Sequence, residues 1–87
     1  MIRVRVRFYA GLRHRVGVSE VTLEFPEEAR VEHAVEELVR MFPGALRRMK
    51  ALMGYAYWVA RDGLQVSLED ELRDGDELVV FPPISGG

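Results

Sequence analysis

Ile2-Arg3-Val4-Arg5-Val6-Arg7-Phe8-Tyr9 opens the chain with a strict alternation of apolar and polar side chains. A period of two residues is typical of a half-buried β-strand. Residues 2–9 are therefore predicted to form a strand that buries Ile2, Val4, Val6 and Phe8 and leaves a solvated arginine face. Residues 19–25 alternate in the same way, and residues 10–18, with Gly11 and Gly17, read as a turn or a single helical turn. The two strands are predicted to pair as an antiparallel hairpin.

A helix is predicted next, because apolar residues recur at helical spacing in residues 31–42. Pro43-Gly44 is expected to end this helix, and residues 45–53 resemble a second short helix closed by Gly54. β-Rich segments follow at residues 55–60, 64–68 and 77–81, with turn sequences at Arg61-Asp62-Gly63 and Asp74-Gly75-Asp76. Strand, strand, helix, strands is an α+β order, with a helical layer on one face of a sheet.

Composition excludes several function classes. The 87 residues suffice for one small domain. A net charge of −2 gives no reason to expect a nucleic acid or an anionic membrane as partner. There is no cysteine, so a disulfide, a thiolate metal site and a cysteine nucleophile are all excluded. Without an apolar targeting or spanning segment, the protein is expected to be soluble and cytoplasmic.

No self-sufficient catalytic group of residues stands out. His33 is expected on the surface of the main helix, and His14 lies between two arginines, which disfavours a bound cation. The acidic run at residues 69–71 is interpreted as a solvated loop. No phosphate-binding loop is present. We therefore predict that this chain binds no cofactor or metal, and that any reaction is catalysed by partner proteins.

The last strand predicts a docking surface. If Leu78 and Val80 face the helix, then Val79 and Phe81 face outward, and the same alternation in the first strand turns Tyr9 outward. Two aromatic residues and a valine on an open sheet face are typical of a protein–protein contact. The alternative is that Phe81 packs under a neighbouring loop. We favour docking because these residues directly precede the end of the sequence.

The sequence ends in Phe81-Pro82-Pro83-Ile84-Ser85-Gly86-Gly87. Glycine packs nothing and is costly to order, so two terminal glycines suit either a frayed end or a reactive tail. A Gly-Gly end has no bulk and can enter a narrow channel, while Pro82 and Pro83 favour an extended backbone that leads away from the sheet. A partner could activate the Gly87 carboxylate with ATP as an acyl-adenylate. A sulfur donor or a lysine amine could then displace AMP.

These segments resemble the MoaD family, the small subunit of molybdopterin synthase and a ubiquitin-like sulfur carrier. The resemblance is carried by residues 1–13, by Leu72-Arg73-Asp74-Gly75-Asp76-Glu77-Leu78 and by the Pro-Pro-Ile-Ser-Gly-Gly ending. It implies a β-grasp domain over residues 1–81, with a mixed sheet of four to five strands, one main helix and a short second helix. Residues 82–87 would form a flexible tail. Two departures are a longer segment between Pro43 and Gly54 and an Arg-Asp-Gly turn at residues 61–63.

The resemblance also implies a function. A MoeB-like enzyme would adenylate Gly87, and a sulfur donor would convert it to a thiocarboxylate. The tail, including Ile84, Ser85 and Gly86, would then enter a MoaE-like large subunit, expected as a heterotetramer, and give sulfur to cyclic pyranopterin monophosphate. By position, Tyr9 and Phe81 match the family's exposed docking residues, which agrees with the outward face predicted above for these residues and Val79.

Three alternatives stay open at the level of the sequence. One is a carrier of the same fold for tRNA thiolation or another sulfur pathway, because the chemistry at the chain end is the same. Another is a protein modifier conjugated to lysines, for which Lys50 is the only lysine acceptor within the chain. The last is a plain interaction domain with an inert tail.

Overall fold

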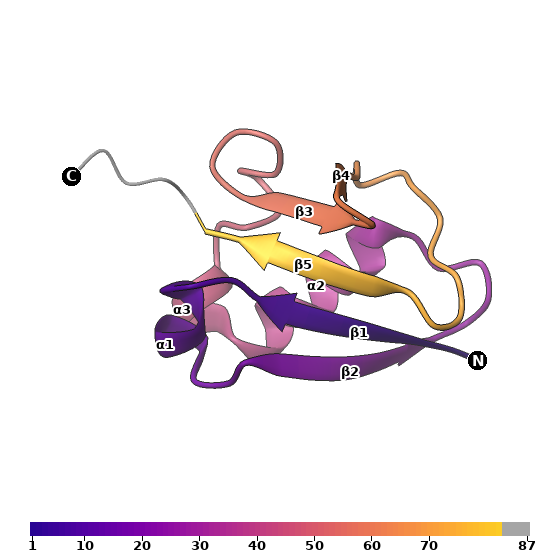
Figure 1. Cartoon of the computed structure of the whole chain (residues 1–87), viewed down its shortest axis with the longest axis horizontal. Coiled ribbons are helices and arrows are strands. Elements are labelled where there is room, and N and C mark those ends of the chain that lie inside the picture. The colour runs from indigo at the N-terminus through magenta and orange to yellow at the C-terminus, as the bar shows by residue number, and fades with distance from the viewer. Residues whose placement is uncertain (83–87) are drawn as a thin grey trace.

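The computed structural model describes residues 1–82. A five-stranded sheet in the order β2-β1-β5-β3-β4 forms one layer of the molecule (Figure 1). Along the chain the elements are β1 (Ile2–Phe8), α1 (Leu12–Val16), β2 (Glu20–Phe25), α2 (Val31–Met41), α3 (Pro43–Leu46), β3 (Trp58–Arg61), β4 (Leu64–Gln65) and β5 (Glu77–Phe81).

The sheet is mixed, and its connections place the main helix. β1 pairs antiparallel with β2, as predicted, and parallel with β5, while β3 pairs antiparallel with both β4 and β5. Parallel neighbours require a crossover, which here includes α2 on one face of the sheet (Figure 1). A mixed sheet around one main helix confirms the predicted α+β class and the β-grasp fold that the resemblance implied.

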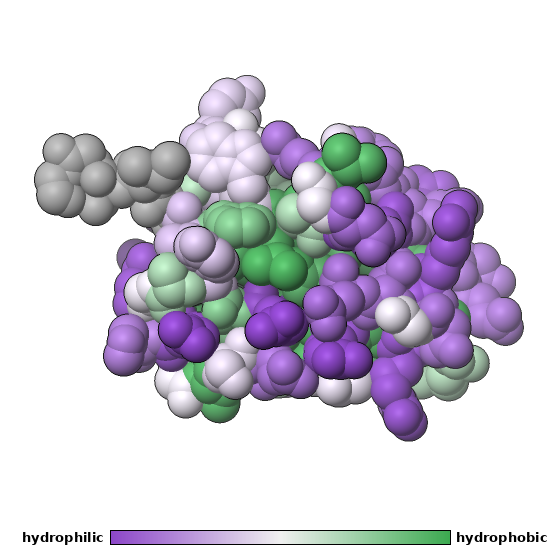
Figure 2. Space-filling view, in the orientation of Figure 1, coloured by the Kyte–Doolittle hydropathy of each residue, from purple (hydrophilic) through white to green (hydrophobic). Residues whose placement is uncertain are grey.

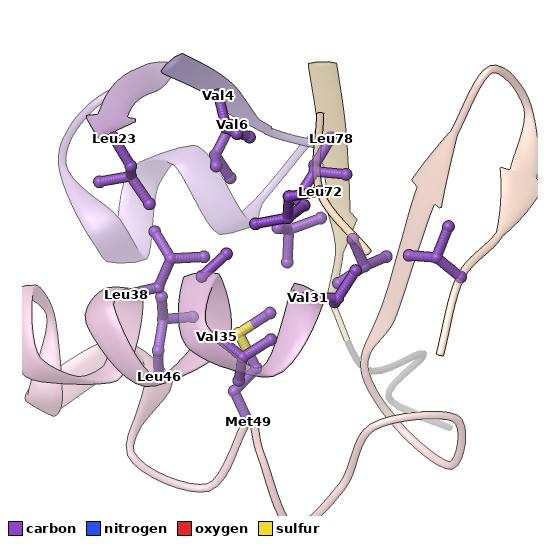
Figure 3. Packing of buried hydrophobic residues seen from close by; sticks show 14 of the residues in the cluster. Val4, Val6, Leu23, Val31, Val35, Leu38, Leu46, Met49, Leu72 and Leu78 are labelled. Atoms are coloured by element: carbon purple, nitrogen blue, oxygen red, sulfur yellow. The ribbon is translucent and has the colours of Figure 1, made fainter. Parts of the chain in front are cut away.

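The core lies between the sheet and α2. Alternate residues of β1 are buried, with Val4 and Val6 at 0% exposure, and Leu78 and Val80 of β5 are buried beside them. On α2 the buried residues are Val31, Ala34, Val35 and Leu38. These apolar side chains meet between the two layers (Figure 3). The predicted periods of two and 3.6 residues are thus the buried faces of one core.

The second helix differs from its prediction over residues 45–53. The main helix α2 ends at Met41, just before Pro43-Gly44, as predicted, but Pro43 also begins α3, because its fixed φ and missing N–H suit the first turn of a helix. After Leu46 the chain continues in turns, and the N–H of Met49 donates to the Leu46 carbonyl, three residues back, at 2.9 Å. Met49 is nevertheless completely buried, so this non-helical segment still contributes a side chain to the core.

The predicted turns at residues 61–63 and 74–76 are both present. Asp62 and Gly63 have φ values of +54° and +78°, the left-handed pair that a tight two-residue hairpin needs. β4 is shorter than predicted and ends at Gln65, although the N–H of Val66 still donates to the Val59 carbonyl at 2.9 Å. Among residues 1–82, no helix is long and apolar enough to cross a membrane.

Candidate functional site

The alternation in β5 correctly predicted which residues are buried and which face outward. Leu78 and Val80 are 1% and 0% exposed, whereas Val79 and Phe81 on the opposite face remain partly exposed. Because β5 lies between β1 and β3 in the sheet, its open face continues onto both neighbours. The face away from α2 therefore carries apolar side chains near the end of β5, where the described chain stops at Pro82.

Tyr9 and Phe81 come together on this face. Their ring centroids are 4.8 Å apart with a tilt of 40°, and 55% of the Tyr9 surface is exposed. The backbone holds the pair, since the N–H of Tyr9 donates to the Val80 carbonyl at 2.9 Å. The next residue, Ala10, has a φ of +48°, a conformation that costs a non-glycine residue about 1–2 kcal/mol. This turn leads the chain from Tyr9 directly into α1.

Trp58, the only tryptophan, belongs to the same surface and was missed in the sequence analysis. Its Cα is opposite that of Phe81 in the β3–β5 register, and its side chain is partly exposed. The alternation in β3 contains the signal, because Val59 is buried and Trp58 must therefore face the other way. Tyr9, Trp58, Val79 and Phe81 are called the open-face patch below. Figure 2 shows hydrophobic residues gathered on this face and bordered by hydrophilic ones.

Charged side chains border the open-face patch. Arg7 and Arg13 line a shallow groove together with Tyr9, Val79 and Phe81. Along the same strands, Glu77 forms ion pairs with Arg5 at 3.3 Å and with Arg7 at 3.8 Å. The predicted solvated face of β1 is thus confirmed, and its arginines are partly neutralised by β5. The groove joins an apolar floor to a cationic rim, a combination suited to a protein partner.

Within residues 1–82 no group of three histidine or acidic side chains is placed to hold a metal ion. His33 is exposed at the start of α2, where its Nδ1 accepts the N–H of Arg30 at 2.8 Å and helps to cap the helix. His14 is exposed on α1. His33 lines a surface groove together with Glu36 and Glu37 of the same helix.

Five of the predicted tail residues lie outside the described residues: Pro83, Ile84, Ser85, Gly86 and Gly87. Pro82 is described and directly follows β5, beside the open-face patch. The structure therefore brings together the predicted docking residues Tyr9, Val79 and Phe81 and adds Trp58. Chemically, the described surface presents apolar and cationic side chains that can bind and orient a protein partner.

Comparisons with known proteins agree with this picture. The molybdopterin synthase sulfur carrier subunit of Escherichia coli is 36% identical, over 97% of this chain and 99% of the relative. Small archaeal modifier protein 1 of Haloferax volcanii is 32% identical, over 93% and 97%. A solved structure, the putative molybdopterin converting factor, subunit 1, of Pyrococcus furiosus, superposes with a TM-score of 0.80 at 32% identity, over 97% and 100%.

The predicted resemblance to the MoaD sulfur carriers is thereby confirmed. The sequence profile of the ThiS family matches residues 6–87, which include the open-face patch and the Gly-Gly ending. The chain belongs to the ThiS family and is related within it to the sulfur carrier subunits of molybdopterin synthase.

Proposed function

We propose that this protein is the sulfur carrier subunit of molybdopterin synthase. The observation that carries the proposal is the match to the ThiS family, which extends through Gly87, together with full-length relatives named as that subunit. The absence of cysteine agrees with it, because the chain itself offers no thiol and would carry sulfur on its terminal carboxyl group. The large subunit would supply the groups that act on the pterin.

The proposed chemistry begins at the Gly87 carboxylate. An oxygen of the carboxylate attacks the α-phosphate of ATP on a MoeB-like enzyme, which releases pyrophosphate and leaves an acyl-adenylate. A sulfur donor then delivers hydrosulfide, which attacks the acyl carbon and expels AMP, and the product is a thiocarboxylate. In the large subunit the thiocarboxylate sulfur bonds to a carbon of cyclic pyranopterin monophosphate as a C–O bond at that carbon breaks and its oxygen leaves. Water then hydrolyses the acyl–sulfur bond, which leaves the sulfur on the pterin and returns the Gly87 carboxylate. ATP is consumed on the activating enzyme, so this chain needs no resident cofactor.

The mass of the chain tests this proposal. The protein is purified from its own cells with an N-terminal tag, and the C-terminal peptide is analysed by mass spectrometry. Exchange of one oxygen for sulfur adds about 16 Da, nominally the same as methionine oxidation, so the shift must map to Gly87. The carrier function would be refuted if Gly87 is unmodified in protein from cells that make the pterin cofactor and stays unmodified when the purified chain is incubated with the activating enzyme and ATP.

The open-face patch is proposed to dock the large subunit. Aromatic residues in a desolvated contact dominate binding energy, so Phe81→Ala or Trp58→Ala is expected to weaken the complex by about 1–3 kcal/mol, with Tyr9→Ala in the same range. Calorimetric titration of the large subunit gives the affinity, and thermal unfolding of each variant is the control for loss of structure. Thr22→Ala on β2 is a matched substitution outside the patch. Unchanged affinity in all three patch variants would refute docking at this surface.

Protein modification is a second candidate, favoured by the similarity to the archaeal modifier protein. Lys50 is the only lysine, and its Nζ donates a hydrogen bond to Glu36, which raises the pKa of Lys50 and lowers that of Glu36. If the chain forms polymers through lysine, Lys50→Arg is expected to remove them and to leave single conjugates on other proteins. Denaturing gels with mass spectrometry distinguish the two. Lysine-linked polymers that persist in the variant would contradict this assignment.

A further inference from the structure

The Lys and Arg residues of this chain are unevenly distributed, although the net charge is only −2. Residues 8–19 and 38–60 contain half of the 12 Lys and Arg residues and none of the 14 Asp and Glu residues. The acidic residues are concentrated elsewhere, notably in residues 69–77 and 27–37. Net charge alone therefore hides a basic region whose location depends on the fold.

The two acid-free segments meet at one end of the molecule. α1 and α3 lie together at the end of the sheet where β1 and β5 finish (Figure 1). Nη2 of Arg15 on α1 donates to the Ala45 carbonyl on α3 at 3.2 Å and joins the two helices. The Asp74-Gly75-Asp76 turn lies at the other end, where the N–H of Gly75 donates to the Arg3 carbonyl at 2.8 Å. Glu20 lies at the start of β2, opposite Arg7 in the β1–β2 register.

Several charges at this end lack a carboxylate partner within residues 1–82. Arg40 and Lys50 are paired with Glu37 and Glu36 of α2. By contrast, Arg13, Arg47 and Arg48 are exposed and form no ion pair within the described part of the chain. These three residues, with Arg15, are called the basic end. Arg13 lines the groove beside Tyr9 and Phe81, so the basic end is continuous with the open-face patch.

We propose that the basic end steers this chain onto a protein whose surface is acidic around the channel that receives residues 82–87. The inference depends on the proposed function and commits to the large subunit of molybdopterin synthase as that partner. Opposite potentials on two approaching surfaces raise the association rate by about 10–10³-fold and orient the encounter, and the effect falls as salt is added. The open-face patch then supplies the short-range contact, which sets the dissociation rate.

Charge reversal separates steering from docking. Arg47→Glu/Arg48→Glu is expected to lower the association rate constant for the purified large subunit at least about tenfold at low salt, with little change in the dissociation rate constant. The difference from the unaltered chain should shrink as ionic strength rises. Arg47→Gln/Arg48→Gln is expected to lie between the two. Stopped-flow binding at several salt concentrations measures these rate constants.

Arg73→Glu is the matched control for a single reversal. Arg73 is exposed, lies beside the turn at the other end of the molecule, and its reversal changes the net charge as much as Arg47→Glu does. The position of the charge is the variable, so Arg73→Glu should alter the association rate constant less than about twofold, and Arg47→Glu should alter it more. Equal effects of the two single reversals would show that only net charge matters and would overturn the inference.

The experiment also separates this inference from the proposed function. If the unaltered chain does not bind the large subunit at all, the proposed function fails. If it binds and the double reversal associates at the same rate with the same salt dependence, the basic end plays no part and only the inference fails. Tighter binding of the reversed chain would assign a basic rim to the partner and would overturn the inference as well.

Discussion

Deletion of Gly87 is expected to abolish sulfur transfer and to leave the free energy of unfolding nearly unchanged. In the proposed reaction the Gly87 carboxylate is the group that is adenylated and thiolated, and the shortened chain ends in Gly86, too far back to reach the same atoms. A displacement of even 1 Å in a reacting group can lower a rate about a hundredfold, and loss of a whole residue spans about 3.3–3.6 Å of extended chain. Formation of molybdopterin from cyclic pyranopterin monophosphate, with excess large subunit and activating enzyme, measures the effect.

Two controls accompany the Gly87 deletion. All buried core residues of the described chain lie between Ile2 and Val80, so thermal unfolding of the deletion variant should match that of the full chain. Gly44→Ala changes a glycine whose Cβ would meet open space, and it should retain full transfer. Full activity of the deletion variant would contradict the carrier chemistry, whereas its unfolding would assign the terminal residue to the fold instead.

Leu78→Ala is expected to destabilise the protein by about 2–5 kcal/mol, the usual cost of a Leu→Ala cavity in a core. Leu78 is 1% exposed on β5, beside Val6 in the register of the central strand pair, and it faces α2. The free energy of unfolding of a native protein is about 5–15 kcal/mol, so this one substitution removes a large share of the stability. Urea unfolding followed by circular dichroism gives the difference in free energy.

Val79→Ala is the neighbouring control for Leu78→Ala. Val79 is partly exposed on the opposite face of β5. Its replacement by alanine should lower the free energy of unfolding by less than about 1 kcal/mol, since little cavity is created. The two variants therefore separate a residue of the core from one of the open-face patch. If Leu78→Ala lowers the free energy of unfolding by less than about 1 kcal/mol, or if Val79→Ala lowers it equally, then Leu78 is not the core side of β5 and Val79 is not its open side.

Much of the fold could be predicted from local sequence, because burial imposes a period on it. The alternation from Ile2 to Phe8 and the helical spacing from Val31 appear in the structure as the two buried surfaces of the core. Asp62-Gly63 predicted its own turn, since few residues accept a left-handed backbone. The outward direction of Val79 and Phe81 also followed from the alternation. Each of these properties is set by residues close together in the chain.

Other features depend on residues that are distant in the sequence. Pairing of β1 with β5 brings Tyr9 against Phe81, and pairing of β5 with β3 adds Trp58 to the patch. α3 ends at Leu46, and the burial of Met49 beyond it depends on core residues from other elements. Arg13 and Arg47 share one end of the molecule because α1 packs beside α3. Periodicity records which face of a segment is buried, but long-range packing selects its neighbour, and the docking surface and the basic end both arise from that selection.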